Sequence, residues 1–265
     1  EEQKQIADFL DKKITNINLL LKRDKHLIEL LTEKRIALIN QIVIKGLNPK
    51  IKFKDSGLDW VGKVPEHWEV RKIDKLSSVK RGASPRPIDD PKYFDDEGEY
   101  SWVRIADVTV SEKYLLKTTQ KLSELGKSKS VPLEPGEIFL SIAATVGKPI
   151  ITKIKCCIHD GFVYFDSLKE NKEFLYYVFS CGEPYKGLGK FGTQLNLNTD
   201  TISNICIPLP SNEEKKQITN FLDKDTAIID ALIEKKERLI KLLQEKRSAL
   251  ITHAVTKGLP AAAAA

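Results

Sequence analysis

The sequence predicts an α+β protein in which two long antiparallel coiled-coil helices flank a compact, β-rich mixed α/β domain. Residues 1–47 recur at 213–259 with a constant offset, and about 25 of the 47 aligned positions are identical. Neither copy contains Pro or Gly before its final Gly-Leu. Between the copies lie short β-branched and aromatic runs separated by turn residues, which are typical of strands.

Each copy is predicted to form one long helix. Apolar residues recur at alternating steps of four and three, the heptad pattern of a coiled coil. The seam residues are Leu10, Ile14, Ile17, Leu21, Ile28, Leu31, Leu38 and Ile42 in the first copy, and Leu222, Thr226, Ile229, Ile233, Ile240, Leu243, Leu250 and Ala254 in the second. Asp24 and Arg35 interrupt the first seam, and Lys236 and Arg247 interrupt the second at the equivalent places.

The helix ends are marked by residue type. Gly46 and Gly258 are expected to end the helices, because glycine readily adopts the left-handed conformation found there. Asn212 is expected to cap the start of the second helix. Each helix would be about 68 Å long at 1.5 Å per residue. A helix of this length cannot bury its apolar stripe alone, so we expect the two copies to pack on each other.

Polar residues outside the seam recur as well, and they indicate a docking surface. Glu33-Lys34-Arg35 returns as Glu245-Lys246-Arg247. A coiled coil that only stiffens or dimerises needs apolar periodicity, not matching polar residues. These two triplets are therefore predicted to dock a partner at two equivalent surfaces.

The rest of the chain divides by composition. We assign 1–47 to the first helix, 48–67 to a linker, 68–210 to the middle domain, 211–259 to the second helix and 260–265 to a tail that is non-native or unassigned. The linker contains two Pro and two Gly, which favour turns, and Trp60 and Trp68 are expected to pack at its join. Strands are predicted at 101–106, 137–142, 149–152, 161–165 and 202–208, with a helix at 170–181. So many short strands suggest a twisted, partly barrel-like domain.

Three loops and one strand of the middle domain carry candidate binding residues. Basic and hydroxyl side chains in the first loop suit phosphates or base edges, although a solvated loop explains them equally well. Amide side chains in the last loop suit adenine, which they can bind with two hydrogen bonds. The candidates are Lys80, Arg81, Ser84, Arg86, Arg104, Thr145, Lys148, Lys186, Lys190, Thr193, Gln194, Asn196 and Asn198. The phosphate-binding pattern GxxxxGK[ST] is absent from the sequence.

Composition excludes several classes of protein. No apolar run approaches the 18 residues of a membrane span. The four cysteines form no CxxC pair and the four histidines are scattered, so we expect free thiols in a reducing cytoplasm, and no metal site. The net charge of +6 is a weak signature for nucleic-acid binding. It would not by itself suggest DNA.

The residues also favour a protein that is not an enzyme. The sequence contains no Asn/Asp-Pro-Pro-Tyr/Phe segment for adenine methylation. A nuclease could use Asp160 or Asp166 with Glu170 and Lys172, but their spacing is short and Lys172 fits a solvated helix face. We therefore set the nuclease hypothesis aside.

The order of these segments resembles the specificity subunit of type I restriction–modification systems, over nearly the whole chain. The resemblance is carried by segments 2–7, 34–39 and 45–47 of the first helix, 64–70 (VPEHWEV), 102–107 (WVRIAD), and 192–198 (GTQLNLN) leading into 207–210. In that family long helices alternate with target recognition domains. A full member has two such domains, whereas this sequence contains one. We therefore expect the C-terminal portion of a longer subunit, or a half-subunit that forms a homodimer.

The resemblance implies a non-catalytic reader of one half-site in double-stranded DNA. It implies docking to two modification subunits, which bind S-adenosylmethionine and methylate adenine, and to restriction subunits as well. No cofactor is expected on this chain. The alternative is a structural coiled-coil scaffold whose middle domain binds protein.

Overall fold

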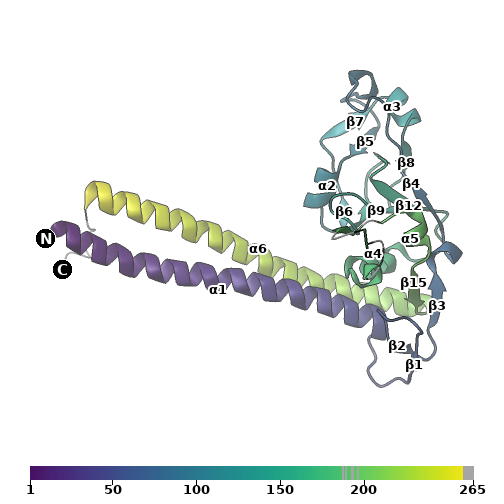
Figure 1. Cartoon of the computed structure of the whole chain (residues 1–265), viewed down its shortest axis with the longest axis horizontal. Helices are drawn as coiled ribbons and strands as arrows, with labels where there is room; N and C mark the ends of the chain where they lie inside the picture. Colours follow the sequence, from purple (N-terminus) through teal and green to yellow (C-terminus); the bar gives the residue numbers. More distant parts are fainter. Residues whose placement is uncertain (187, 189, 192–193, 196, 259–265) are drawn as a thin grey trace. The chain divides into compact units, whose positions relative to one another are not determined.

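The computed structural model describes residues 1–186, 188, 190–191, 194–195 and 197–258, in two units. Unit 1 comprises 1–37 with 223–265, and unit 2 comprises 38–222. A long helix precedes and another follows a β-rich domain in the sequence (Figure 1). The predicted fold class is thereby confirmed. The tail expected at 260–265 lies outside the described residues.

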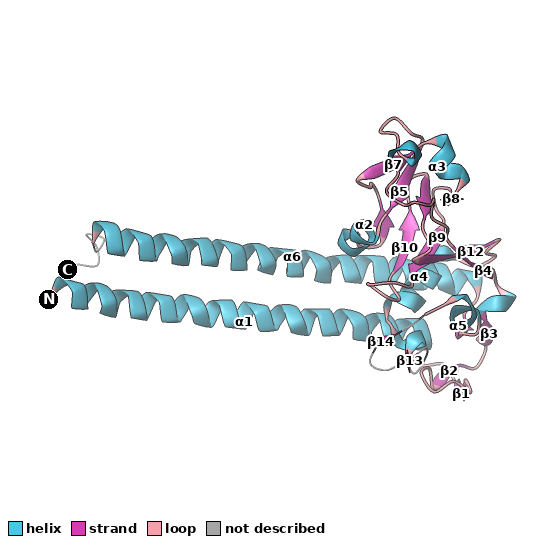
Figure 2. Ribbon diagram, turned by 45° about the horizontal axis from the view of Figure 1, so that its top comes forward, coloured by secondary structure: helices cyan, strands magenta, loops and turns pink. Residues whose placement is uncertain are grey.

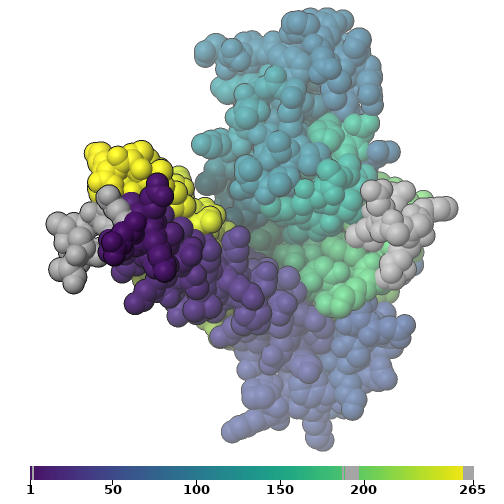
Figure 3. Space-filling model, turned by 60° about the vertical axis from the view of Figure 1, so that its left-hand side comes forward, coloured from purple at the N-terminus to yellow at the C-terminus, as the bar shows by residue number. Residues whose placement is uncertain are grey.

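Unit 1 consists of the paired helices α1 (Glu2–Lys45) and α6 (Asn212–Lys257), up to the points where both continue into unit 2. They lie side by side (Figures 2 and 3), and their ion pairs show that they are antiparallel. Asp24 pairs with Lys236, whereas the later Arg35 pairs with the earlier Asp230. Every residue of the predicted seam is buried or half-buried. The seam prediction is therefore confirmed.

The helix ends agree with the sequence at their C-termini but not at the start of α6. Gly46 and Gly258 follow the helices with φ of 70° and 78°, in the left-handed region. At the start of α6, Ser211 Oγ rather than Asn212 accepts the amide of Glu214, at 3.2 Å. The Glu214 carboxylate in turn accepts the Ser211 amide at 3.2 Å. This reciprocal capping box provides acceptors for two backbone amides at the start of the helix. Asn212 is already a residue of the helix and does not cap it.

Unit 2 contains two larger sheets (Figure 1). One has the order β4-β12-β9-β10-β6 and the other β7-β5-β11-β8. Their strands are β4 (Ser78–Arg81), β5 (Tyr100–Val103), β6 (Tyr114–Leu115), β7 (Gln120–Leu122), β8 (Val131–Leu133), β9 (Ile138–Ser141), β10 (Pro149–Thr152), β11 (Cys156–Ile158) and β12 (Phe162–Asp166). Among the described residues both orders are linear, so neither sheet closes into a ring as a complete barrel would.

Shorter elements complete unit 2. The strands β1 (Phe53–Asp55) with β2 (Lys63–Pro65), β3 (Glu69–Lys72) with β15 (Cys206–Leu209), and β13 (Lys190–Phe191) with β14 (Gln194–Leu195) form two-stranded ladders. The helices are α2 (Ile105–Val110), α3 (Glu124–Ser128), α4 (Lys172–Ser180) and α5 (Thr199–Ser203), with 3-10 turns η1 (Ile73–Lys75), η2 (Pro91–Tyr93) and η3 (Glu183–Tyr185). None of the helices in the described part of the chain is long and apolar enough to cross a membrane.

Two sequence predictions need correction here. The strand expected at 202–208 begins only at Cys206, because Asn198 caps the short helix α5 through the Thr201 amide (2.8 Å). The strand expected at 101–106 ends at Val103, and the helix α2 begins at Ile105. The four thiols are free as predicted, and burial raises the pKa of Cys156 to about 12.

The core of unit 2 includes the inner ends of both long helices. Apolar residues of α1 and α6 pack with α4 and the five-stranded sheet, and Trp68 is fully buried among them. A Cβ on Gly46 would lie 3.0 Å from the Trp68 ring, so glycine permits this close packing. The Trp68 Nε1 donates to Glu214 Oε1 at 3.2 Å, and His67 Nε2 lies 2.9 Å from the same oxygen. Glu214 therefore joins the start of α6 to the start of β3.

Replacing Glu214 by Gln should lower the stability of unit 2 by about 1–3 kcal/mol, because it weakens hydrogen bonds to a charged group. Burial raises the pKa of Glu214, but the bonds from His67, Trp68 and Ser211 outweigh it and lower that pKa below 4.5. Because the pKa of Glu214 is lower in the folded protein than in the unfolded chain, its ionised form stabilises the fold fully above the unfolded pKa. This contribution is lost as the pH falls through the folded pKa. Urea unfolding between pH 7 and 3 should show that the free energy of unfolding falls less toward low pH for Glu214→Gln than for the original chain. The neighbouring Glu213→Gln is the control, and equal effects of the two changes would contradict this role.

Candidate functional site

The turn between β11 and β12 is the point at which the first candidate loop is anchored. Because β4 pairs with β12, the loop after β4 lies beside this turn. Ser84 Oγ donates to Asp160 Oδ1 at 2.8 Å, and Arg86 Nη2 donates to Asp160 Oδ2 at 2.9 Å. Arg81 Nε donates to the Asp160 carbonyl oxygen at 2.5 Å. One residue thus holds three predicted binding residues together.

The backbone of this loop is held equally closely. The Gly82 amide donates to the Phe162 carbonyl at 2.9 Å, and the Ala83 amide donates to the Ile158 carbonyl at 3.2 Å. A Cβ on Gly82 would lie 2.2 Å from the His159 carbonyl oxygen, so only glycine permits the approach. The loop therefore begins as a fixed extension of the sheet.

His159 lies within the same turn, and the charge of Arg104 acts on its ring. Its ring packs against Phe162 (centroids 4.5 Å apart) and Trp102 (5.8 Å). Burial lowers the pKa of His159, the charge of Asp160 raises it, and that of Arg104 lowers it further, for a net lowering. His159 is therefore favoured in its neutral form. Arg104 follows β5, which pairs with β11, and its side chain is exposed.

The second candidate loop, 143–148, begins beside the same turn. The Ile142 amide donates to the Gly161 carbonyl at 2.9 Å. Thr145 Oγ1 lies 2.9 Å from Thr109 Oγ1, and Lys148 Nζ donates to the Thr109 carbonyl at 3.0 Å. Burial lowers the pKa of Lys148. The loop is thus tied to α2, the helix that Arg104 precedes.

Other predicted residues are placed elsewhere or are not described. Lys80 and Arg81 are successive strand residues and so point to opposite faces; Lys80 Nζ pairs with Asp166 Oδ2 at 2.5 Å. Lys186 pairs with Glu183 at 2.7 Å, and Asn198 caps α5. Residues outside the described set are Thr193 and Asn196, together with the side chains of Lys190 and Gln194.

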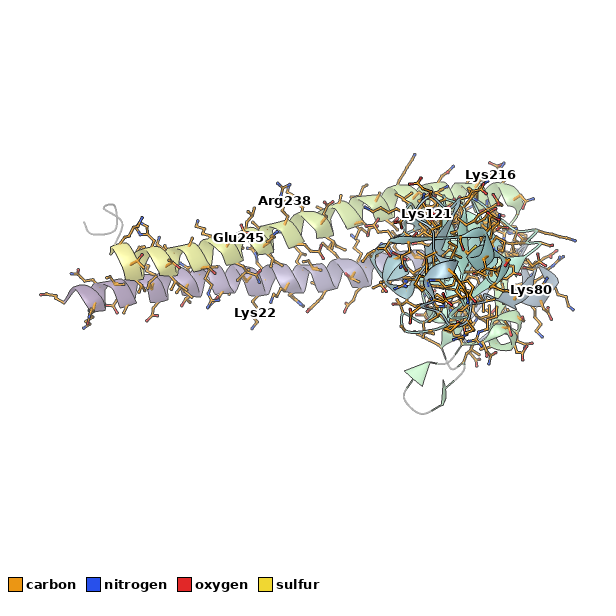
Figure 4. All side chains as sticks on the ribbon, turned by 90° about the horizontal axis from the view of Figure 1, so that it is seen from above. Lys22, Lys80, Lys121, Lys216, Arg238 and Glu245 are labelled. Carbon is orange, nitrogen blue, oxygen red and sulfur yellow. The ribbon has the colours of Figure 1, made fainter. Side chains whose placement is uncertain are left out.

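The predicted docking triplets in unit 1 are not equivalent in the structure. Arg35 Nε donates to Asp230 Oδ1 at 2.7 Å across the helix pair, and the Arg35 side chain is 22% exposed. The remaining five side chains, Glu33, Lys34, Glu245, Lys246 and Arg247, are exposed. Figure 4 likewise shows the exposed Lys22 and Arg238 projecting from opposite outer sides of the pair. Arg35 is thus already engaged within the pair.

The carboxylates of the nuclease hypothesis do not gather. Asp160 pairs with Arg86, Asp166 with Lys80, and Glu170 Oε2 accepts from Lys215 Nζ at 2.5 Å. Within the described residues no group of three or more His, Cys, Asp or Glu side chains could hold a metal ion.

Sequence reasoning missed Asp160 and Thr109 as anchors of the candidate loops. Asp160-Gly161 after a strand is a turn signal, and it could have marked the position. Its role in binding three side chains depends on pairing between β4 and β12, which local sequence does not show. The assembled surface presents guanidinium, ammonium and hydroxyl donors, a chemistry that suits an anionic ligand.

Comparison with known proteins adds a family match. The family described as type I restriction modification DNA specificity domain matches residues 65–242. The MjaVIII type I restriction enzyme specificity subunit of Methanocaldococcus jannaschii is 29% identical over 95% of this chain and 60% of its own length. The putative MjaX specificity subunit of the same organism is 26% identical over 95% of this chain and 57% of its own. The chain thus spans about three-fifths of these curated relatives.

A solved structure is similar as well. The HsdS subunit from Thermoanaerobacter tengcongensis aligns with a TM-score of 0.59 at 19% identity, over 98% of this chain and 59% of that one. At this identity the likeness shows a shared fold.

Replacing Asp160 by Ala should loosen the first loop. Amide hydrogen exchange at Gly82 and Ala83 should accelerate by about tenfold or more, the equivalent of losing about 1.4 kcal/mol of anchoring. The bond from Ser84 lowers the pKa of Asp160, burial raises it, and Arg86 lowers it again, for a net lowering. The anchor should therefore hold above pH 3.8 and weaken as pH falls through the lowered value. Asp166→Ala, which removes the Lys80 pair, is the control. Unchanged exchange in Asp160→Ala would refute the anchor.

Proposed function

Because this chain belongs to the type I restriction–modification DNA specificity family, we propose that it reads one half-site of a double-stranded DNA target. The observation that carries the proposal is the family match across the domain in which the two candidate loops and Arg104 converge. The chain would be non-catalytic. Methylation, with its S-adenosylmethionine, would belong to partner modification subunits, and cleavage to restriction subunits.

The geometry supports two kinds of DNA contact in this proposal. Arg81 and Arg86 are exposed and anchored, which suits phosphate contacts that fix the position of the protein on DNA. Arg104 is exposed beside the rigid turn, and a bidentate contact from it would select guanine. The amides of Gln194 and Asn196 remain candidates for adenine, whereas the Asn198 Oδ1 already accepts hydrogen bonds from Thr201 in capping α5.

The paired helices of unit 1 support docking of modification subunits. Beyond the buried seam each copy carries a second apolar stripe of three leucines. All six leucines of the two copies are at least 36% exposed: Leu20, Leu27, Leu30, Leu232, Leu239 and Leu242. Steps of seven and three place them on one face of each helix. Lys34 lies four residues after Leu30, and Lys246 lies four residues after Leu242, so each lysine continues the stripe of its helix. Such a stripe suits an amphipathic partner helix with leucines and acidic residues.

The two stripes are equivalent surfaces. The repeat relates one stripe to the other. A two-fold axis that exchanges two antiparallel helices is perpendicular to the plane that contains both helix axes. Equivalent stripes therefore lie on the same side of that plane, so two copies of one modification subunit could bind alike.

The decisive experiment is a methylome. The chain is co-expressed with its modification subunit in a methylation-deficient host, and N6-methyladenine is mapped. A new motif that appears only with this chain would establish the reader role, and a palindromic motif would indicate two copies of the chain. Absence of new methylation, together with absence of binding to duplex DNA at low salt, would favour a protein-binding scaffold.

Replacing Arg81 or Arg86 by Ala should weaken DNA binding for all sequences alike. Each lost phosphate contact should reduce the slope of log K against log salt by about 1. Arg104→Ala should instead reduce discrimination at one base pair by about 1–3 kcal/mol. Fluorescence anisotropy across a salt series and a target panel measures both effects, with the exposed Lys216→Ala on α6 as control. A slope that does not change in either loop variant would refute the phosphate assignment.

Replacing Leu30 and Leu242 by Glu should abolish binding of the modification subunit while leaving the helix pair intact, because both side chains are exposed. Co-purification measures binding and circular dichroism measures helix content. The paired change Lys22→Glu with Arg238→Glu, on the outer sides, is the control. Binding that survives the leucine changes would remove the stripe from the docking surface.

A further inference from the structure

We propose that the Asp24–Lys236 ion pair determines which helices pair, so that each helix copy accepts the other copy and rejects a second copy of itself. The inference concerns α1 and α6 within unit 1, and it does not rest on the proposed function. Each helix therefore packs its seam against a helix of the other copy.

The ion pair lies within the helix seam. Lys236 Nζ is 2.9 Å from Asp24 Oδ1, and their side chains are 26% and 1% exposed. Asp24 Oδ2 is buried and has no hydrogen-bond partner among the described residues. Arg23 Nη2 lies 4.0 Å from Asp24 Oδ1, but Arg23 is 69% exposed, so solvent screens its charge. Lys236 is thus the main compensation for a buried carboxylate.

The repeat makes this pair unusual. Positions 24 and 236 are equivalent in the two copies, so the pseudo-two-fold axis of the helix pair passes between them. Among the seam positions they alone carry opposite charges; the other polar interruption is Arg35 and Arg247, which are alike. Most remaining seam positions are apolar in both copies. On those residues alone, a helix would pair with its own kind as well as with the other copy.

Pairing of like copies would place like charges in contact. Two α1 helices in the observed register would bring Asp24 against Asp24, and two α6 helices would bring Lys236 against Lys236. A buried charge without an opposite partner is strongly destabilising, whereas a buried ion pair adds little stability compared with apolar residues. The pair therefore acts on the choice of partner, as polar residues at single seam positions do in coiled coils.

Charge variants of the full chain test this inference. Asp24→Lys and Lys236→Asp each create like charges, and amides of residues 17–31 should exchange about tenfold faster or more. The double variant with both changes restores an opposite pair and should regain protection. Mixing the two single variants should yield a 1:1 heterodimer in native mass spectrometry, because each supplies the charge that the other lacks.

An apolar control separates partner choice from stability. Asp24→Leu with Lys236→Leu should keep the helices protected, yet form more higher-order species than the original chain, because like copies are no longer rejected. The proposal is overturned if the charge-reversed double variant is as unprotected as the single variants, or if the apolar variant shows the oligomer distribution of the original chain.

Discussion

Both long helices depend on one constraint, which is that neither copy can bury its own apolar stripe. Each seam residue becomes buried or half-buried only against the other copy or the core of unit 2. Antiparallel pairing within unit 1 leaves Asp24 opposite Lys236. The same pairing leaves the leucines of the second stripe exposed on both helices, which is the basis of the docking proposal.

In unit 2 the corresponding constraint is the anchoring of loops on a sheet. The turn before β12 receives the loop after β4 through Asp160 and the loop after β9 through Gly161. Cationic side chains are costly to order individually, because long side chains lose rotamer freedom. A shared carboxylate holds Ser84 and Arg86 in defined positions before any ligand arrives. Such preorganisation lowers the entropy cost of binding.

Local patterns were sufficient where one residue type has one structural use. The 4–3 spacing predicted the seam, and Gly46 and Gly258 predicted the helix ends. Local patterns failed where several residue types compete for one role. Ser211 rather than Asn212 caps α6, because only Ser211 has Glu214 three residues further on. Ile202 was predicted to begin a strand but lies in the helix α5, because Asn198 caps that helix.

The sequence by itself determined the two matched helices, the β-rich middle domain and the resemblance to type I specificity subunits. These follow from periodicity and internal repetition, which are properties of the chain alone. Only the tertiary structure decided that Lys80 pairs with Asp166, that Asp160 binds the first loop, and that Arg35 is used within the helix pair. The physical reason is that each of these contacts joins residues far apart in the chain, and strand pairing or helix register must form before they meet.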